Sequence, residues 1–250
     1  LGVFFDPQYQ GDGLKIQEII KRGPFDVKNT GVTAGCIIES IDGEEIKAGM
    51  DYFPLLDGKV GKNVRLGIRN AKGKKMEVTV KAISQGKLNN LLYKRWVDRN
   101  RAFVDSISGG RIAYVHVKAM NSESFRTVYS ELLSDKNRNR DAVIVDERHN
   151  GGGWLHDDLC TLLNGKQYQE FVPHGKVVGR DPFNKWVKPS CVMICENDYS
   201  NGHGFPWVYK ELGIGKLIGA PVAGTMTAVW WETLMDNTLV FGIPQVGCRD

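Results

Sequence analysis

Between residues 111 and 219, short apolar runs alternate with segments of helical periodicity. The runs "RIAYVHV", "AVIVD" and "SCVMIC" are largely apolar and rich in β-branched residues, which is typical of strands buried on both faces of a parallel sheet. The segment after the first run places Phe125, Val128, Leu132 and Leu133 on one helical face, and "WLHDDLCTLL" and "FPWVYKEL" are predicted to be further helices. "KLIGAPVAG" follows as another strand. This order predicts an α/β layer with a mostly parallel sheet.

The first third of the chain has a different pattern. The runs "LGVFF", "LKIQEII", "GCIIESI", "VRLGI" and "MEVTVKAI" are short, rich in β-branched or aromatic residues, and bounded by Gly, Asp or Asn. The pair Asp42-Gly43 indicates a tight turn. We therefore expect a β-rich domain over residues 1–86 and an α/β domain over residues 87–250, with a polar helical segment after Ser84 connecting them.

Composition excludes several classes of protein. The chain has 250 residues, of which 42% are hydrophobic and 25% charged, so a folded core is expected. The net charge is only +4 and the charges are interleaved, which argues against nucleic-acid binding. No apolar run approaches the ~20 residues of a membrane span. The chain starts in mid-strand and stops without a closing element, so we expect a piece of a longer protein, whose compartment stays open between exported and cytoplasmic.

The five cysteines are odd in number and form no CxxC pair, so they indicate neither a disulfide framework nor a thiol metal site. Cys191 and Cys195 lie in an apolar run and are expected to be buried thiols; a catalytic cysteine is the alternative. His116 alternates with apolar residues and is expected to be an ordinary sheet residue. His149, His156, Asp157 and Asp158 match no standard ligand spacing, and we expect no metal and no cofactor.

Two glycine-containing corners follow buried strands. Ser200 stands between an apolar run and a helical segment, with Gly202 and Gly204 just behind it, and Gly151 to Gly153 follow the strand "AVIVD". A serine at a strand-to-helix corner is exposed, and consecutive glycines let backbone N–H groups approach a ligand oxygen. An acyl-transfer enzyme needs this combination. The alternative is a flexible connection without chemistry; a phosphate loop is not supported, since no GxxxxGK[ST] occurs.

Four segments, "RIAYVHVKAM", "VIVDERHNGGGW", "ENDYSNGHGFPW" and "KELGIGKLIGAPVAGT", resemble in this order the tricorn core proteases and, more distantly, the tail-specific (C-terminal processing) peptidases. The resemblance implies a β-rich PDZ-like domain followed by a crotonase/ClpP-like α/β core. It implies that Ser200 is the nucleophile of a serine peptidase. The backbone N–H groups of Gly152, Gly153 and Asn201 would correspond to the oxyanion hole, with the donating glycine left open.

Three positions depart from the pattern of these families. Tail-specific peptidases have a lysine base where this chain has Thr225, so a Ser/Lys dyad is not expected. The resemblance to tricorn-like enzymes implies a Ser-His-Ser-Glu relay, whose histidine and glutamate would lie outside this chain. A serine without its base is a poor nucleophile, so residues 1–250 alone are expected to be inactive or nearly so. Relatives often carry aspartate where Asn201 stands, which predicts that a preference for basic P1 residues is lost. His203 stands where an acidic residue is common; as the base it is a less favoured alternative, because Pro206 suggests that Ser200 precedes the helix.

The start of the first domain predicts a peptide-binding function. Leu1-Gly2-Val3-Phe4 resembles the carboxylate-binding loop and strand of bacterial PDZ domains, which makes Gly2, Val3 and Phe4 candidate peptide-binding residues. A spacer role is the alternative. The expected partners are peptides or unfolded proteins, with a homo-oligomer left open. A non-catalytic peptide-binding scaffold is the rival function, and an acyl-CoA enzyme on the same core is a weaker one.

Overall fold

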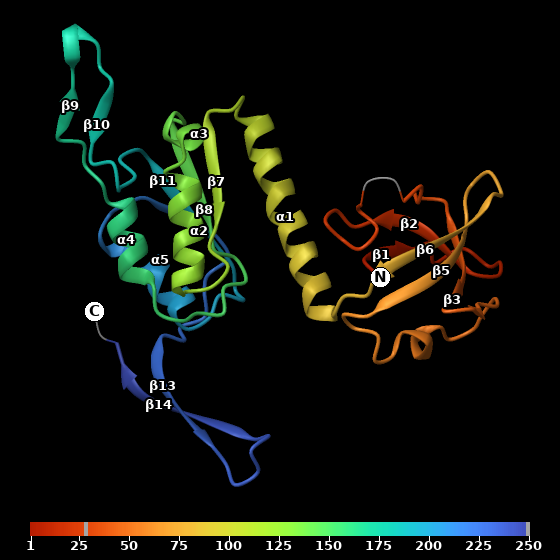
Figure 1. Cartoon of the computed structure of the whole chain (residues 1–250). Coiled ribbons are helices and arrows are strands. Elements are labelled where there is room, and N and C mark those ends of the chain that lie inside the picture. Colours follow the sequence, from red (N-terminus) through yellow and green to blue (C-terminus); the bar gives the residue numbers. More distant parts are fainter. Residues whose placement is uncertain (28–29, 249–250) are drawn as a thin grey trace. The chain divides into compact units, whose positions relative to one another are not determined.

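The computed structural model describes residues 1–27 and 30–248 and divides into two units, Leu1–Asp98 and Arg99–Asp250. Each unit has a hydrophobic core of its own. The division falls within the long helix α1 (Gln85–Ile107), so part of this helix belongs to each unit (Figure 1). The domain boundary predicted from the sequence, between residues 86 and 87, lies near the start of the same helix and stays a prediction.

The first unit is built on an antiparallel sheet. Its strands are β1 (Val3–Phe5), β2 (Leu14–Ile19), β3 (Ile37–Ile41), β4 (Glu44–Glu45), β5 (Asn63–Arg69) and β6 (Lys75–Lys81), in the order β1-β2-β3-β5-β6 with β4 paired to β3. A short 3-10 helix, η1 (Phe53–Leu56), precedes β5. Strand β5 alternates in burial, with Val64, Leu66 and Ile68 inside. The period of two selects one face of the sheet for the core.

The turn between β3 and β4 confirms the hairpin signal in the sequence. Asp42 and Gly43 both have positive φ angles, 51° and 97°, as the tightest two-residue hairpin turns require. Asp42 also accepts the Arg65 N–H through Oδ1 at 2.8 Å, which ties the turn to β5.

The second unit contains the predicted parallel sheet. Strands β7 (Ile112–His116), β8 (Ala142–Asp146), β11 (Ser190–Ile194) and β12 (Lys216–Gly219) lie in the order β12-β11-β8-β7, and all three pairings are parallel. Helix α2 (Ser122–Leu132) contacts β7, α4 (His156–Leu163) lies beside α2, and α5 (Asn201–Glu211) packs on α4 and β12. These contacts place the three helices side by side over the sheet (Figure 1). Helix α3 (Asp135–Arg138) is a single turn.

Local sequence explains where α2 begins and which face it buries. Asn121 caps the helix by accepting the Ser124 N–H through its side chain, at 2.9 Å, and the acidic Glu123 lies in the first turn. Val128 and Leu132 are fully buried, as the helical spacing in the sequence predicts.

Two hairpins were not expected from the sequence. Strands β9 (Gln169–Phe171) and β10 (Gly179–Asp181) flank the short helix η2 (Pro173–Gly175), and β13 (Thr227–Thr233) pairs with β14 (Val240–Gly247). Both extend away from the four-stranded sheet (Figure 1). Most of their residues are exposed, so they lack the alternating burial that a sequence pattern reports. Within the described ranges, no helix combines the length and the hydropathy that crossing a bilayer needs.

Candidate active site

Ser200 occupies a backbone conformation that serine rarely adopts. It is the residue before the first turn of α5, with φ 54° and ψ −120°. A positive φ is costly for a residue with a side chain, and such conformations gather at functional corners. A serine at this position normally accepts an N–H from the first helical turn through its hydroxyl, but Ser200 makes no such bond. The half-buried hydroxyl is therefore not used to cap the helix.

The glycine loop lies against this corner and tolerates no side chain there. A Cβ on Gly152 would lie 2.6 Å from Ser200 Cβ and 2.7 Å from the Tyr199 carbonyl oxygen. A Cβ on Gly153 would lie 2.1 Å from the carbonyl oxygen of Met120, and both glycines have positive φ angles. Glycine is required at both positions because two backbone segments approach each other here.

The loop is fastened to the end of β7 and to the Ser200 corner by backbone and side-chain hydrogen bonds. The Met120 N–H donates to the Gly152 carbonyl at 2.9 Å, and Trp154 N–H donates to the Met120 carbonyl at 2.7 Å. Asn150, which is fully buried, donates from Nδ2 to the Val117 carbonyl and accepts the Tyr199 N–H on its own carbonyl, both at 2.9 Å.

Two backbone N–H groups remain available beside Ser200. Gly152 donates its N–H to Asn150 Oδ1 at 2.9 Å, so this candidate oxyanion donor is engaged inside the loop. The N–H groups of Gly153 and Asn201 donate to no acceptor among residues 1–27 and 30–248. Gly153, Ser200 and Asn201 line one cavity of about 550 Å³. The Asn201 amide is also the first of α5, where the helix dipole favours negative charge.

The side chain of Asn201 has a structural task. It is only 2% exposed, and its Oδ1 accepts the N–H groups of Leu155 and His156 at 2.7 and 3.1 Å. Its Nδ2 lies 2.8 Å from His156 Nδ1. Asn201 therefore satisfies N–H groups at the start of α4 and ties this helix to the Ser200 corner. Its role in P1 selection stays a prediction.

Thr225 and His203, the two positions considered for a base, lie near Ser200. Neither side chain forms a hydrogen bond to the Ser200 hydroxyl in the described chain. Thr225 Oγ1 accepts the Ser200 N–H at 3.2 Å, which places position 225 beside the serine, with a hydroxyl rather than an amine. His203 donates its N–H to the Ser200 carbonyl, yet no hydrogen bond joins its ring to Ser200 Oγ in the described chain. Helix α5 begins at Asn201, earlier than "FPWVYKEL" suggested, and Pro206 lies within it; Ser200 precedes the helix as predicted.

Comparison with known proteins identifies the family. The model of peptidase family S41 matches residues 111–246, and the model of the tricorn protease PDZ domain matches residues 7–85. The chain belongs to peptidase family S41. The first match covers more than half of the chain and contains the glycine loop and Ser200. The predicted resemblance and the predicted order of a PDZ-like domain and an α/β core are confirmed.

Individual S41 relatives agree with this assignment. The chain is 28% identical over 209 residues to the tricorn protease of Thermoplasma acidophilum, covering 82% of this chain and 19% of that protein. It is 28% identical over 224 residues to a tricorn protease homolog of Saccharolobus solfataricus, covering 88% of this chain and 20% of the relative. The crystal structure of the tricorn protease superposes with a TM-score of 0.76 at 24% identity, over 92% of this chain and 23% of that chain. The chain thus spans about a fifth of the length of the curated relatives it matches.

Two buried acids, Glu147 and Asp198, contact the start of the glycine loop at Asn150 and were missed by the sequence analysis. Glu147 is fully buried, and its carboxylate oxygens have no hydrogen-bond partner among the described residues. Burial, together with the nearby Asp198 and Asp146, raises the pKa of the Glu147 carboxyl well above its usual value. Burial also raises the pKa of Asp198, which accepts the N–H groups of Asn150 and Cys195 at 3.2 and 2.8 Å. A polar residue directly after a buried strand is the signal that could have indicated Glu147; Asp198 lies four residues after β11 and had no such signal.

Cys195 is buried as expected, whereas Cys191, which pairs with Lys216 of β12, is only half-buried. His116 is a buried sheet residue whose Nε2 lies 3.3 Å from the Arg148 carbonyl. Asp157 and Asp158 lie in the first turn of α4. In the part of the chain that the structure describes, no group of three or more His, Cys, Asp and Glu side chains could hold a metal ion.

Proposed function

We propose that this chain carries the nucleophile and the oxyanion hole of a serine peptidase. One observation carries the proposal. Among the described residues, the Ser200 hydroxyl, held at a strained corner, and the N–H groups of Gly153 and Asn201 in the same cavity have no hydrogen-bond partner. A non-catalytic scaffold would need neither the strain nor the open donors, since both cost free energy of folding.

The geometry supports an acyl-transfer sequence. Ser200 Oγ forms a bond to the scissile carbonyl carbon while its proton passes to a base, and the carbonyl oxygen becomes an oxyanion that accepts the N–H groups of Gly153 and Asn201. Collapse of this intermediate breaks the C–N bond, with the amine leaving as it takes up a proton. Water then attacks the acyl-enzyme in the same way and releases Ser200. Each lost oxyanion donor removes about 2.7–4 kcal/mol of transition-state stabilisation.

We expect the base to come from a part of the protein beyond this chain, as the tricorn resemblance implies. Thr225 and His203, the neighbouring candidates in the chain, form no hydrogen bond to Ser200 Oγ within the described ranges. A serine hydroxyl without a base is a poor nucleophile.

The cavity at Ser200 supports a preference for uncharged substrates. None of its described lining residues is Asp, Glu, Lys, Arg or His, and most of its wall is apolar, with Trp154, Tyr199, Met226, Val229, Trp231 and Pro244. A lysine or arginine side chain would lose hydration there without gaining a partner. We infer that P1 is neutral or apolar, which agrees with the expectation drawn from Asn201.

The first unit supports a peptide-binding role. Strand β1 pairs with β2 on one side and lies at an edge of the sheet, so its other side can accept a peptide strand by main-chain hydrogen bonds. Gly2 has a positive φ of 74° directly before β1, at the predicted carboxylate-binding loop, and Phe4 is exposed on the strand. We propose that Gly2, Val3 and Phe4 bind the end of a peptide substrate.

The test is peptide hydrolysis by the longer protein that contains this chain. Ser200→Ala is expected to lower kcat by roughly 10⁴-fold or more, as removal of a nucleophile does in serine peptidases. Ser190→Ala serves as a control, because this serine lies in β11 and bonds to the Tyr209 hydroxyl away from the cavity. Unchanged hydrolysis in Ser200→Ala would remove the proposal.

A further inference from the structure

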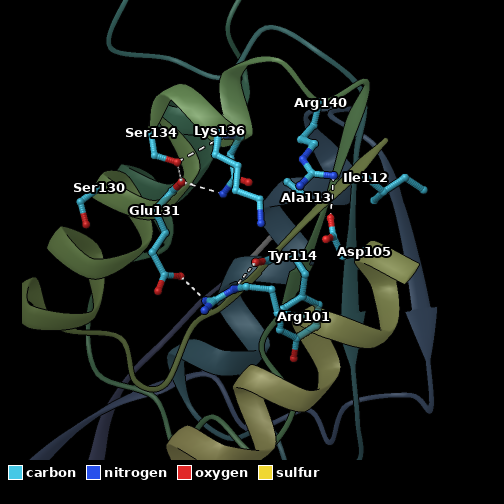
Figure 2. A pocket seen from close by; sticks show the side chains of 11 residues that line it. Arg101, Asp105, Ile112, Ala113, Tyr114, Ser130, Glu131, Ser134, Lys136 and Arg140 are labelled. Carbon is cyan, nitrogen blue, oxygen red and sulfur yellow. Dashed lines mark hydrogen bonds and ion pairs between the residues drawn. The ribbon is translucent and has the colours of Figure 1, made fainter. Parts of the chain in front are cut away.

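A second cavity lies at the amino end of β7, an edge strand of the parallel sheet. It has a volume of about 310 Å³ and is lined by the last turns of α1, the first residues of β7, the end of α2 and the segment around α3 (Figure 2). Ser200 follows the carboxyl end of β11, whereas this cavity lies at the amino end of β7, and the two cavities share no lining residue. The peptidase mechanism makes no use of it.

Two ion pairs form opposite walls of this cavity. Arg101 Nη2 lies 2.8 Å from Glu131 Oε2, and Arg140 Nη1 lies 2.7 Å from Asp105 Oδ1. Each arginine is also held by a backbone carbonyl, that of Tyr114 for Arg101 and that of Gly110 for Arg140. Arg140 is only 9% exposed. Both carboxylates of the cavity are therefore matched by a fixed guanidinium group.

Lys136 is the third cation of this cavity, and no carboxylate among the described residues pairs with it. Figure 2 shows its side chain pointing into the space between Glu131 and Arg140. No hydrogen bond or ion pair to its ammonium group exists in the described part of the chain. The cavity thus has one positive charge in excess.

The neutral groups of the cavity are already engaged or apolar. The Tyr114 hydroxyl donates to Asp146 Oδ2 at 2.6 Å, and Asn137 Nδ2 donates to the Glu131 carbonyl at 2.7 Å. Ile112 and Ala113 add an apolar wall at the start of β7. A ligand would therefore meet one unpaired ammonium group and a small apolar surface.

We propose that this cavity binds a small monocarboxylate with an apolar body, such as an N-blocked amino acid or the last residue of a peptide. The single negative charge of a carboxylate balances the single unpaired charge of Lys136, and its aliphatic part packs on Ile112 and Ala113. Phosphate monoesters carry about −1.5 to −2 at neutral pH, so they fit the excess charge less well. The site is independent of the proposed peptidase activity.

Calorimetric titration of the chain with N-acetyl-leucine at low salt tests the proposal, with N-acetyl-leucine amide as the neutral analogue of the same shape. The acid is expected to bind at least about tenfold more tightly than the amide, and added salt should weaken it because Lys136 is exposed. A peptide ending in leucine distinguishes the two sources of carboxylate: tighter binding than N-acetyl-leucine assigns the site to chain ends, and weaker binding assigns it to free acids.

Two matched variants locate the binding. Lys136→Gln is expected to weaken N-acetyl-leucine about tenfold or more, while Lys166→Gln, which removes an exposed lysine outside both cavities, should leave it unchanged. Amide NMR shifts should move at Ala113 and Ser130. Equal binding of acid and amide, insensitivity to Lys136→Gln, tighter binding of inorganic phosphate, or shifts confined to Gly153 and Ser200 would each overturn the proposal.

Discussion

A serine before the first turn of a helix usually turns its hydroxyl back onto the helix, and Ser200 does not. Its positive φ and ψ of −120° direct the chain so that the hydroxyl and the first amide of α5 line one cavity. The next residue makes this possible. The buried Asn201 side chain accepts two N–H groups at the start of α4, which fixes α5, the helix that follows the serine, against α4.

Asn201→Ala is expected to lower the free energy of unfolding by about 1–3 kcal/mol, because the N–H groups of Leu155 and His156 lose their acceptor. Asn201→Asp keeps an acceptor in place and should lose less. Urea unfolding of the two variants measures both changes. Equal stability of Asn201→Ala and the unchanged chain would contradict the capping role.

Glu147 gives the chain a pH dependence with a definite sign. Its folded pKa lies above the unfolded value of about 4.3, so the folded state holds more protons between the two values. Stability therefore falls as pH rises through this window, by up to about 1.4 kcal/mol per pH unit from this group. Asp198, whose pKa is also raised, contributes in the same direction.

Glu147→Gln removes this titration and is expected to be more stable than the unchanged chain, by a margin that grows as the pH rises above the unfolded pKa of about 4.3. Urea unfolding at several pH values measures it. The same slope with and without Glu147 would show that the carboxyl is not held protonated.

At the scale of elements, the glycine loop is a rigid part of the site rather than a flexible connection. Gly153→Ala is expected to lower the free energy of unfolding by about 1–3 kcal/mol or more, since the added Cβ overlaps the Met120 carbonyl. Gly151→Ala is the matched control, because nothing lies within 4 Å of a Cβ there. Thermal unfolding compares the two. Similar losses for both variants would mean that the close approach at Gly153 is not needed.

At the scale of elements, part of the fold could be predicted from local signals in the sequence. The parallel sheet and the Ser200 corner follow from continuous apolar runs and from glycine positions, which are local signals. The hairpin β13–β14 exposes most of its residues, so no alternation marks it. The bonds of Asn150 to Val117 and Tyr199 join residues far apart in sequence, and no local pattern reports which N–H groups such a side chain occupies. Gly152 could not be separated from Gly153 in advance, because only the folded conformation of the loop brings the Gly152 N–H onto Asn150 Oδ1.

At the scale of the whole molecule, residues 1–250 are expected to hydrolyse peptides at a rate near that without enzyme, because no base contacts Ser200 Oγ in the described chain. Serine-dependent turnover by this chain alone would contradict the expectation that the base lies elsewhere.

The homo-oligomer left open by the sequence stays a prediction that sedimentation velocity can test.

The longer protein is expected to cleave after leucine or phenylalanine with a kcat/KM at least about tenfold above that after arginine, because the cavity at Ser200 offers no carboxylate. Val229→Asp, which places a carboxylate on its wall, should reduce this ratio. A library of fluorogenic peptides that differ only at P1 measures the preference. Preference for arginine in the unchanged protein would refute this assignment of specificity.

The most direct test of the account is reaction of the longer protein with a fluorophosphonate probe, followed by mass spectrometry of the labelled peptide. The account predicts one label on Ser200, none in Ser200→Ala, and full labelling in Ser190→Ala. Labelling that persists in Ser200→Ala would contradict the claim that this hydroxyl is the nucleophile.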